Sequence, residues 1–326
     1  MKLTLLITAI LVGTMGYAQA TKKTYCNPLV VGNIPKKALT IQAEYQTGFE
    51  VQTNNKFSIS PTTNFNRLKN VLNTRLNYYK PIIAKQKLVV TLDAGYWLSK
   101  FNGTPPYSTP IISDLTGTSL HAASASTNIF KPINSKNFLL INAAVELNGN
   151  GVSIQKLGVK NLLVSGAILY GWKKGIQQMT AIGVLRAYRL GQVIYVPALL
   201  WNKNFNKKWG VEMLLPARGF VRYTIKKTDF ITAGFDLEGT QYAYSSNTTP
   251  DLNHSFLRRG EIKPRIGVDV KLKKNTRFTA NIGSRINARL EWADTYAGKT
   301  ILVNNSVSTN VFVQAGFHIV SLKKKK

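Results

Sequence analysis

Apolar and polar residues alternate along residues 38–52, which read ALTIQAEYQTGFEVQ. From Leu39 onward, one parity carries Leu, Ile, Ala, Tyr, Thr, Phe and Val, and the other carries Thr, Gln, Glu, Gln, Gly, Glu and Gln. A period of two predicts a β-strand whose two faces meet unlike environments. The run is longer than the usual strand of about 5–6 residues, which indicates an unusually thick wall.

The same period recurs through the chain, whereas helical periodicity is rare. The clearest further example is RFTANIGSRINARLEW at residues 277–292. Two segments, 177–190 and 192–202, alternate weakly because both of their faces are fairly apolar. We predict about twelve strands in total: residues 39–52, 68–80, 87–99, 137–148, 159–172, 177–190, 192–202, 209–226, 230–241, 257–272, 277–292 and 309–321.

The connections between these segments alternate in length. Short periplasmic turns and longer extracellular loops are typical of outer-membrane barrels, and an even strand number returns the chain to the side on which it began. Pro216 or Gly219 could split segment 209–226 and change that parity. The expected turns are 81–86, 149–158, 191, 227–229 and 273–276, and the expected loops are 53–67, 100–136, 173–176, 203–208, 242–256 and 293–308.

Strand length separates a transmembrane barrel from a soluble β-sandwich, which also alternates. A tilted transmembrane strand needs about 9–11 residues, and most of the predicted segments reach that length. Aromatic residues near the segment ends, such as Tyr78, Tyr170, Trp172 and Trp292, fit interfacial girdles. An open sheet cannot satisfy its edges in lipid. The predicted fold is therefore all-β: a single closed antiparallel transmembrane β-barrel with short periplasmic turns and longer extracellular loops.

Charged residues in the predicted strands fall almost entirely on one parity. A charge that faces hydrocarbon at the midplane of a barrel costs roughly 2–4 kcal/mol, so this parity is expected to face the lumen. Opposite charges on neighbouring strands can pair across the ladder. The predicted lumen-facing charged residues are Glu44, Glu50, Arg75, Asp93, Glu146, Glu212, Arg218, Arg222, Asp236, Glu238, Arg265, Asp269, Arg277, Arg285, Arg289 and Glu291.

The first twenty residues, MKLTLLITAILVGTMGYAQA, are predicted to form a cleaved signal peptide. Lys2 provides the positive region, an apolar run follows, and Ala18-Gln19-Ala20 is a small-x-small cleavage site. The alternative, an N-terminal anchor helix, would need about 20 apolar residues. The predicted domains are a signal peptide (1–20), a short N-terminal periplasmic segment (21–37) and an outer-membrane β-barrel (38–326).

The chain is strongly basic, with 43 Lys and Arg against 14 Asp and Glu. Export makes nucleic acid an unsuitable partner for this charge, whereas a membrane surface that carries phosphate groups fits it. The expected partners are outer-membrane lipid or lipopolysaccharide and the barrel-insertion machinery, and nothing in the sequence indicates a particular oligomeric state. The single cysteine, Cys26, excludes an internal disulfide.

The signal ending in GYAQA, the basic short turns and the run WGVEMLLPARGFVRY at residues 209–223 carry a resemblance. They resemble the outer-membrane β-barrel proteins of unknown function that are common in Bacteroidetes-type bacteria. The resemblance implies location and fold. It implies no catalytic residue, because no activity is established for these proteins.

A search for chemistry in the sequence finds no catalytic or metal-binding motif. The three histidines, His121, His254 and His318, are scattered, no zinc-type Cys/His spacing occurs, and no cofactor is expected. We therefore predict a non-enzymatic barrel, either a narrow channel for small, anionic solutes or a structural or surface-binding barrel. The alternative is a barrel enzyme that acts on lipid or acyl chains through extracellular-loop residues such as Asp251 and His254.

Overall fold

The computed structural model describes residues 25–30, 32–55, 63–151, 162–188, 191, 193–226, 228–246, 248–295 and 300–320. The predicted signal peptide lies outside the described residues. Within the described part, no helix is long and apolar enough to cross a membrane.

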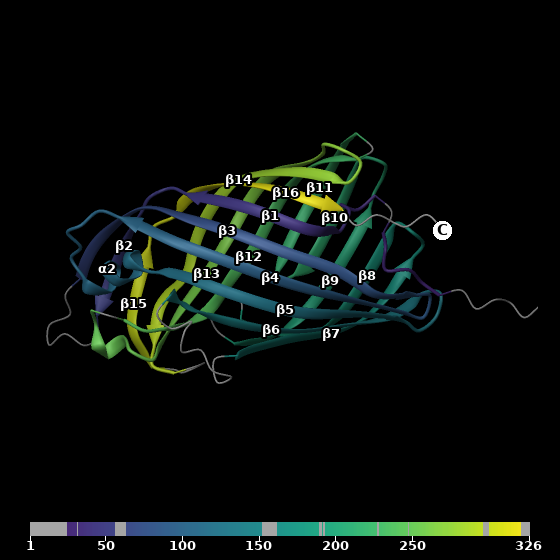
Figure 1. The fold of residues 1–326 in the computed structure, drawn as a ribbon. Helices are drawn as coiled ribbons and strands as arrows, with labels where there is room; N and C mark the ends of the chain where they lie inside the picture. Colours follow the sequence, from purple (N-terminus) through teal and green to yellow (C-terminus); the bar gives the residue numbers. More distant parts are fainter. Residues whose placement is uncertain are drawn as a thin grey trace, which may run out of the picture.

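The strands form one sheet that closes on itself (Figure 1). β1 pairs with β3 on one side and with β16 on the other, and β14 pairs with both β15 and β16. The strands are β1 (Lys37–Gln46), β2 (Phe49–Asn55), β3 (Thr63–Lys85), β4 (Leu88–Gly103), β5 (Ser119–Pro132), β6 (Asn137–Asn150), β7 (Leu162–Lys174), β8 (Gln178–Ala187), β9 (Ile194–Asn204), β10 (Trp209–Leu215), β11 (Arg218–Lys226), β12 (Asp229–Tyr244), β13 (Ser255–Lys271), β14 (Thr276–Ala293), β15 (Ile301–Val307) and β16 (Asn310–Val320), and the helices are α2 (Pro110–Gly117) and the 3₁₀ turn η3 (Pro250–Leu252).

The closed antiparallel barrel confirms the predicted fold class, with fourteen strands in place of about twelve. β1 and β2 are two parts of one strand, interrupted at residues 47–48, and β15 and β16 are parts of another. The prediction missed β5, because Ser, Thr and Ala dominate both of its faces and conceal the alternation. It also merged β10 and β11, which a turn at residues 216–217 separates.

The two ends of the barrel differ in their connections. The end at which β1 begins and β16 ends, called the turn end, has short connections at 86–87, 133–136, 175–177, 205–208, 227–228 and 272–275. The opposite end, called the loop end, carries α2 and η3 and lies on the left in Figure 1. Because the prediction omitted β5, it assigned the connections 149–158, 173–176, 191 and 203–208 to the wrong ends of the barrel. It also omitted the turn at 216–217, and this second omission returned the later strands to the correct direction.

The outer face of the wall is an apolar belt. Ile41, Ile168, Ile282 and Phe317 each leave more than half of their surface exposed. Monomeric soluble proteins rarely expose a contiguous apolar patch beyond a few hundred Å², so this belt is the face expected to meet lipid. Tyr78, Tyr170 and Trp172 lie on it, as the girdle prediction requires, whereas Phe49 and Trp292 point into the barrel.

At the loop end the barrel narrows into a neck. β10 and β11 are short, and above them β6 and β12 meet directly, with Ala243 paired in parallel to Gly149. Asn148 donates from Nδ2 to Thr240 Oγ1 at 2.7 Å across this junction. The neck is therefore enclosed by fewer strands than the rest of the barrel, so the side chains of a small helix can fill it.

Candidate functional site: the barrel interior

The interior holds most of the predicted lumen-facing charged residues. They alternate with the apolar belt because successive side chains of a strand point to opposite faces. Arg218 shares the inward parity at the exposed β10–β11 turn. The residues on this face are Glu44, Arg75, Asp93, Glu146, Glu212, Arg218, Arg222, Asp236, Glu238, Arg265, Asp269, Arg277 and Arg285.

Glu50, Arg289 and Glu291 were predicted to face the lumen but lie on the outward parity. The interruption at residues 47–48 shifts the parity of β2, so that Phe49 and Val51 point inward and Glu50 is exposed. A bulge in β14, opposite Gly260 and Glu261, likewise reverses the parity of the β14 residues that follow Asn287. Leu290 and Trp292 consequently fill the neck. On the outer side of the wall, Glu291 forms ion pairs with Arg258 at 3.2 Å and with Arg289 at 3.3 Å.

Glu44 is the centre of a buried polar layer near the middle of the barrel. One carboxylate oxygen accepts from Gln46 Nε2 at 2.8 Å and Asn73 Nδ2 at 3.0 Å, and the other accepts from Lys263 Nζ at 2.6 Å and Gln314 Nε2 at 2.9 Å. These donors come from four strands: β1, β3, β13 and β16. Glu44 is only 5% exposed. Its buried carboxylate therefore links β1 to β3, β13 and β16, where the first and last strands of the barrel pair.

Further ion pairs cross the lumen beside Glu44. Lys263 also contacts Glu238 on β12 at 3.2 Å, and Glu238 in turn contacts Arg75 on β3 at 3.2 Å. Towards the neck, Glu261 pairs with both Arg259 and Arg285. Only 2% of the Arg259 side chain and none of the Arg285 side chain is exposed to solvent. Water therefore does not reach these two guanidinium groups.

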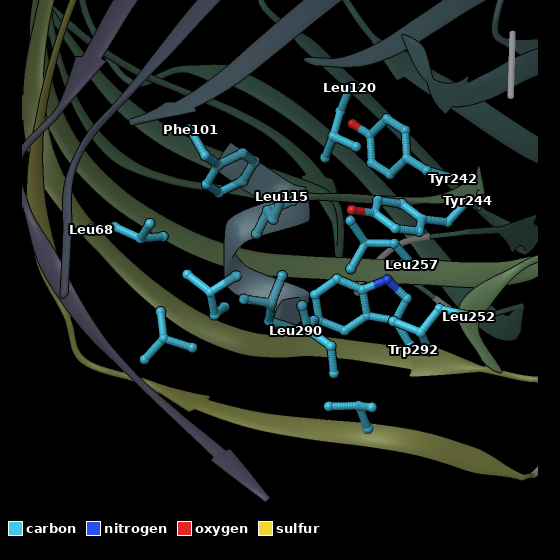
Figure 2. Packing of buried hydrophobic residues seen from close by; sticks show 14 of the residues in the cluster. Leu68, Phe101, Leu115, Leu120, Tyr242, Tyr244, Leu252, Leu257, Leu290 and Trp292 are labelled. Carbon is cyan, nitrogen blue, oxygen red and sulfur yellow. The ribbon is translucent and has the colours of Figure 1, made fainter. Parts of the chain in front are cut away.

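A helix closes the neck beyond the ion pairs. Pro110 begins α2, a position that suits proline because the first N–H of a helix has no intrahelical partner. Ile111, Ile112 and Leu115 of α2 belong to an apolar cluster with side chains of the surrounding strands. Figure 2 shows Leu115 among these strand residues. The predicted loop 100–136 therefore contains a helix, and the apolar residues of PIISDLTG have the spacing of one helix face. The strand residues in the cluster include Phe101, Leu120, Tyr242, Tyr244, Leu257, Leu290 and Trp292.

On the turn-end side of the ion-pair layer, several lumen side chains remain accessible to water. The side chains of Arg75, Asp236 and Glu212 point inward yet keep 30%, 26% and 24% of their surface accessible. A side chain inside a closed barrel can retain such accessibility only beside a space large enough for water. The turn-end half of the lumen is thus a chamber lined by charged groups. The neck separates this chamber from the loop end.

The N-terminal segment, of which the structure describes residues 25–30 and 32–36, crosses the turn end of the chamber. The Cys26 amide donates to Asn134 O at 3.1 Å in the β5–β6 turn, Lys173 Nζ donates to Asn27 O at 2.6 Å, and the Ile34 amide donates to Glu212 Oε1 at 3.1 Å. Burial raises the pKa of the Cys26 thiol.

Side chains of this segment complete an apolar cluster on the inner face of β5–β9. Cys26 and Val30 join Phe138, Leu169 and Met179 there. This contact explains why β8 and β9 alternate weakly, since their inner faces are apolar too. The segment therefore narrows the turn-end mouth.

The three histidines lie in separate parts of the barrel. His121 lies on β5 rather than in the predicted loop, and its Nδ1 is 2.6 Å from Tyr96 Oη on the outer wall. His318 is buried on β16 between Thr279 and Thr40. His254 lies in the loop that follows η3. In the described part of the chain, no group of three or more His, Cys, Asp or Glu side chains could hold a metal ion.

The sequence belongs to a family that has been defined without a function. Residues 110–320 match the family described as "Domain of unknown function (DUF6268)", and the chain is a member of it. No curated protein matches the chain.

Solved structures with a similar barrel fold include outer-membrane channels and the translocating units of autotransporters. The TodX monoaromatic hydrocarbon channel deltaS2 mutant is 10% identical, with a TM-score of 0.41 over 90% of this chain and 93% of that chain. A Pseudomonas aeruginosa FadL homologue is 9% identical, with a TM-score of 0.43 over 86% and 90%. An outer membrane channel from Pseudomonas putida F1 is 9% identical, with a TM-score of 0.34 over 90% and 96%. At this identity the likeness concerns the barrel fold alone.

Proposed function

We propose that this protein is a non-enzymatic outer-membrane barrel that passes small polar solutes and rests in a closed state. The apolar belt supports placement in a membrane, and a closed barrel leaves no unpaired sheet edge there. The charged chamber supports passage of polar solutes. The observation that carries the closed state is the packing of Ile112 and Leu115, both fully buried, in the neck.

Solute passage requires α2 to leave the neck. The ion-pair layer beneath it connects β1, β3, β12 and β13 and must also rearrange, since Arg259 and Arg285 are fully desolvated. We therefore expect rare openings of small conductance in the wild-type protein. The preference for anions that the basic composition suggested belongs to this proposal, and the reversal potential in a salt gradient measures it.

Single-channel recording in planar bilayers tests the proposal. Ile112→Ser together with Leu115→Ser weakens the apolar cluster and should raise the open fraction at least severalfold. Ser113→Ala is the matched control, because Ser113 lies on the same helix and is exposed. Absence of conductance in the wild-type protein and in the double variant, with both proteins folded, contradicts a channel and leaves a structural or surface-binding barrel.

The membrane location has its own test. Fractionation should recover the protein in the outer membrane, extractable only with detergent, and depletion of the barrel-insertion machinery should leave it unfolded. N-terminal sequencing of the mature protein should place cleavage after Ala18 or Ala20. Recovery in the soluble periplasmic fraction contradicts the location.

A further inference from the structure

A groove of about 730 Å³ opens near the loop end, on the side of the barrel where β1 passes into β2. Its lining comes from Thr47 and Gly48, from β3 residues that include Arg67 and Lys69, and from the connection between β4 and α2, which contributes residues such as Ser108. Ser108 Oγ donates to Phe65 O at 2.8 Å, which holds this connection against β3.

The groove exists because the strands are irregular there. Gly48 lies against β3 so closely that a Cβ atom would be 2.8 Å from the carbonyl oxygens of Leu68 and Lys69. β3 bulges between Leu68 and Asn70 at the same level. The bulge places Arg67 and Lys69 on the outer side, while Leu68 and Val71 point into the neck cluster.

Arg67 and Lys69 lie at the edge of the apolar belt that is nearer the loop end. Towards the turn end, the outer face of β3 continues with Leu72, Leu76 and Tyr78, which are each nearly half exposed. Both cations are exposed, and neither has an ion pair among the described residues. Two cations at i and i+2 on one strand face are about 7 Å apart, a spacing that one phosphorylated sugar can bridge.

The surroundings of the two cations add one positive and one negative group. Lys100 on β4 is exposed on the outer side opposite Leu72. Glu50 on β2 is the cross-strand neighbour of Arg67 and is also exposed. Because Glu50 lies outside the groove lining and forms no ion pair with Arg67, it weakens the positive field without neutralising it.

We propose that this groove binds the phosphorylated headgroup of an outer-leaflet glycolipid of the lipid A type. The loop end is the extracellular end if the short turns are periplasmic, so its belt edge lies at the level of outer-leaflet phosphates. Cations just beyond an apolar belt attract anionic headgroups. Phe65, exposed beside the groove, contributes an apolar contact for the lipid. The inference rests on the proposed outer-membrane location, but it does not depend on conduction through the lumen.

Native mass spectrometry of the purified protein in nonionic detergent, with bisphosphorylated lipid A added, measures binding. Arg67→Gln together with Lys69→Gln should weaken it about tenfold, and lipid A without phosphates should bind the wild-type protein as weakly. Glu50→Gln should strengthen binding severalfold. Lys80→Gln together with Lys85→Gln is the matched control, because it removes the same charge from β3 at the turn end.

The outcomes decide the assignment. Unchanged binding in the Arg67/Lys69 variant, or equal binding of the dephosphorylated lipid, overturns it. An equal loss in the Lys80/Lys85 control also overturns it, since total charge would then explain the binding. Retained mobility of each variant on cold SDS gels shows that the barrel is folded, so a loss of binding reports on the groove.

Discussion

Replacing Glu44 by glutamine tests whether the buried polar layer holds the barrel together. The amide keeps one acceptor oxygen for Gln46 and Asn73, but its NH₂ group then faces the Lys263 ammonium and the Gln314 amide. Gln314 cannot simply turn its amide over, because its oxygen accepts from Asn281 Nδ2 at 2.8 Å. In this orientation two donors oppose the new NH₂ group. If the amide turns over, its NH₂ group faces Asn73 instead, whose side-chain oxygen already accepts from Ser99 Oγ at 2.6 Å.

The expected cost follows from the Lys263 ammonium. Breaking a buried ion pair by removing one partner costs about 3–5 kcal/mol. Lys263 keeps Glu238 at 3.2 Å as a second partner, so we expect Glu44→Gln to destabilise the barrel by about 3 kcal/mol, near the low end of that range. This is a large share of the total for a protein whose stability is typically about 5–15 kcal/mol.

Urea titration of the barrel in lipid vesicles, followed by cold-SDS mobility, measures this cost. Glu50→Gln is the matched control, because it makes the same chemical change in the same stretch of sequence on the outer face. It should change the free energy of unfolding by less than about 0.5 kcal/mol. In a double-mutant cycle, Lys263→Met should cost less in the Glu44→Gln background than in the wild type. Equal costs of Glu44→Gln and Glu50→Gln would refute the reasoning.

Three further predictions concern other parts of the barrel. Cys26 should react slowly with a maleimide at neutral pH, because its thiol is buried and its pKa is raised; Ile34→Pro, which removes the donor to Glu212, should accelerate the reaction if the segment leaves the mouth. Gly171→Val should hinder folding, because a Cβ atom would lie 2.2 Å from Phe138 Cζ, whereas Gly175→Asn in an open turn should fold. Lipid hydrolysis assays should give the same background for the wild-type protein and His254→Ala; a lower rate in the variant would support the enzyme alternative.

The sequence determined the class of fold and the sorting of most side chains. Long period-two runs with charges on one parity admit few structures other than a membrane barrel, because hydrocarbon excludes charge and every strand edge must pair. The same logic placed Glu44, Arg75 and Asp269 on the inner parity, where the structure has them. It did not detect β5, since alternation carries no signal when both faces are small and weakly polar.

Only the tertiary structure decided where that parity changes and what fills the lumen. Glu44 and Glu50 look equivalent in ALTIQAEYQTGFEVQ, yet the interruption at residues 47–48 places one inside and the other outside. The interruption is set by contact with the β3 bulge, which brings together residues about twenty positions apart in the chain. The closure of the neck by α2 likewise depends on strands from both halves of the chain. Local alternation contains no information about such contacts, because it reports only which face of a strand is apolar.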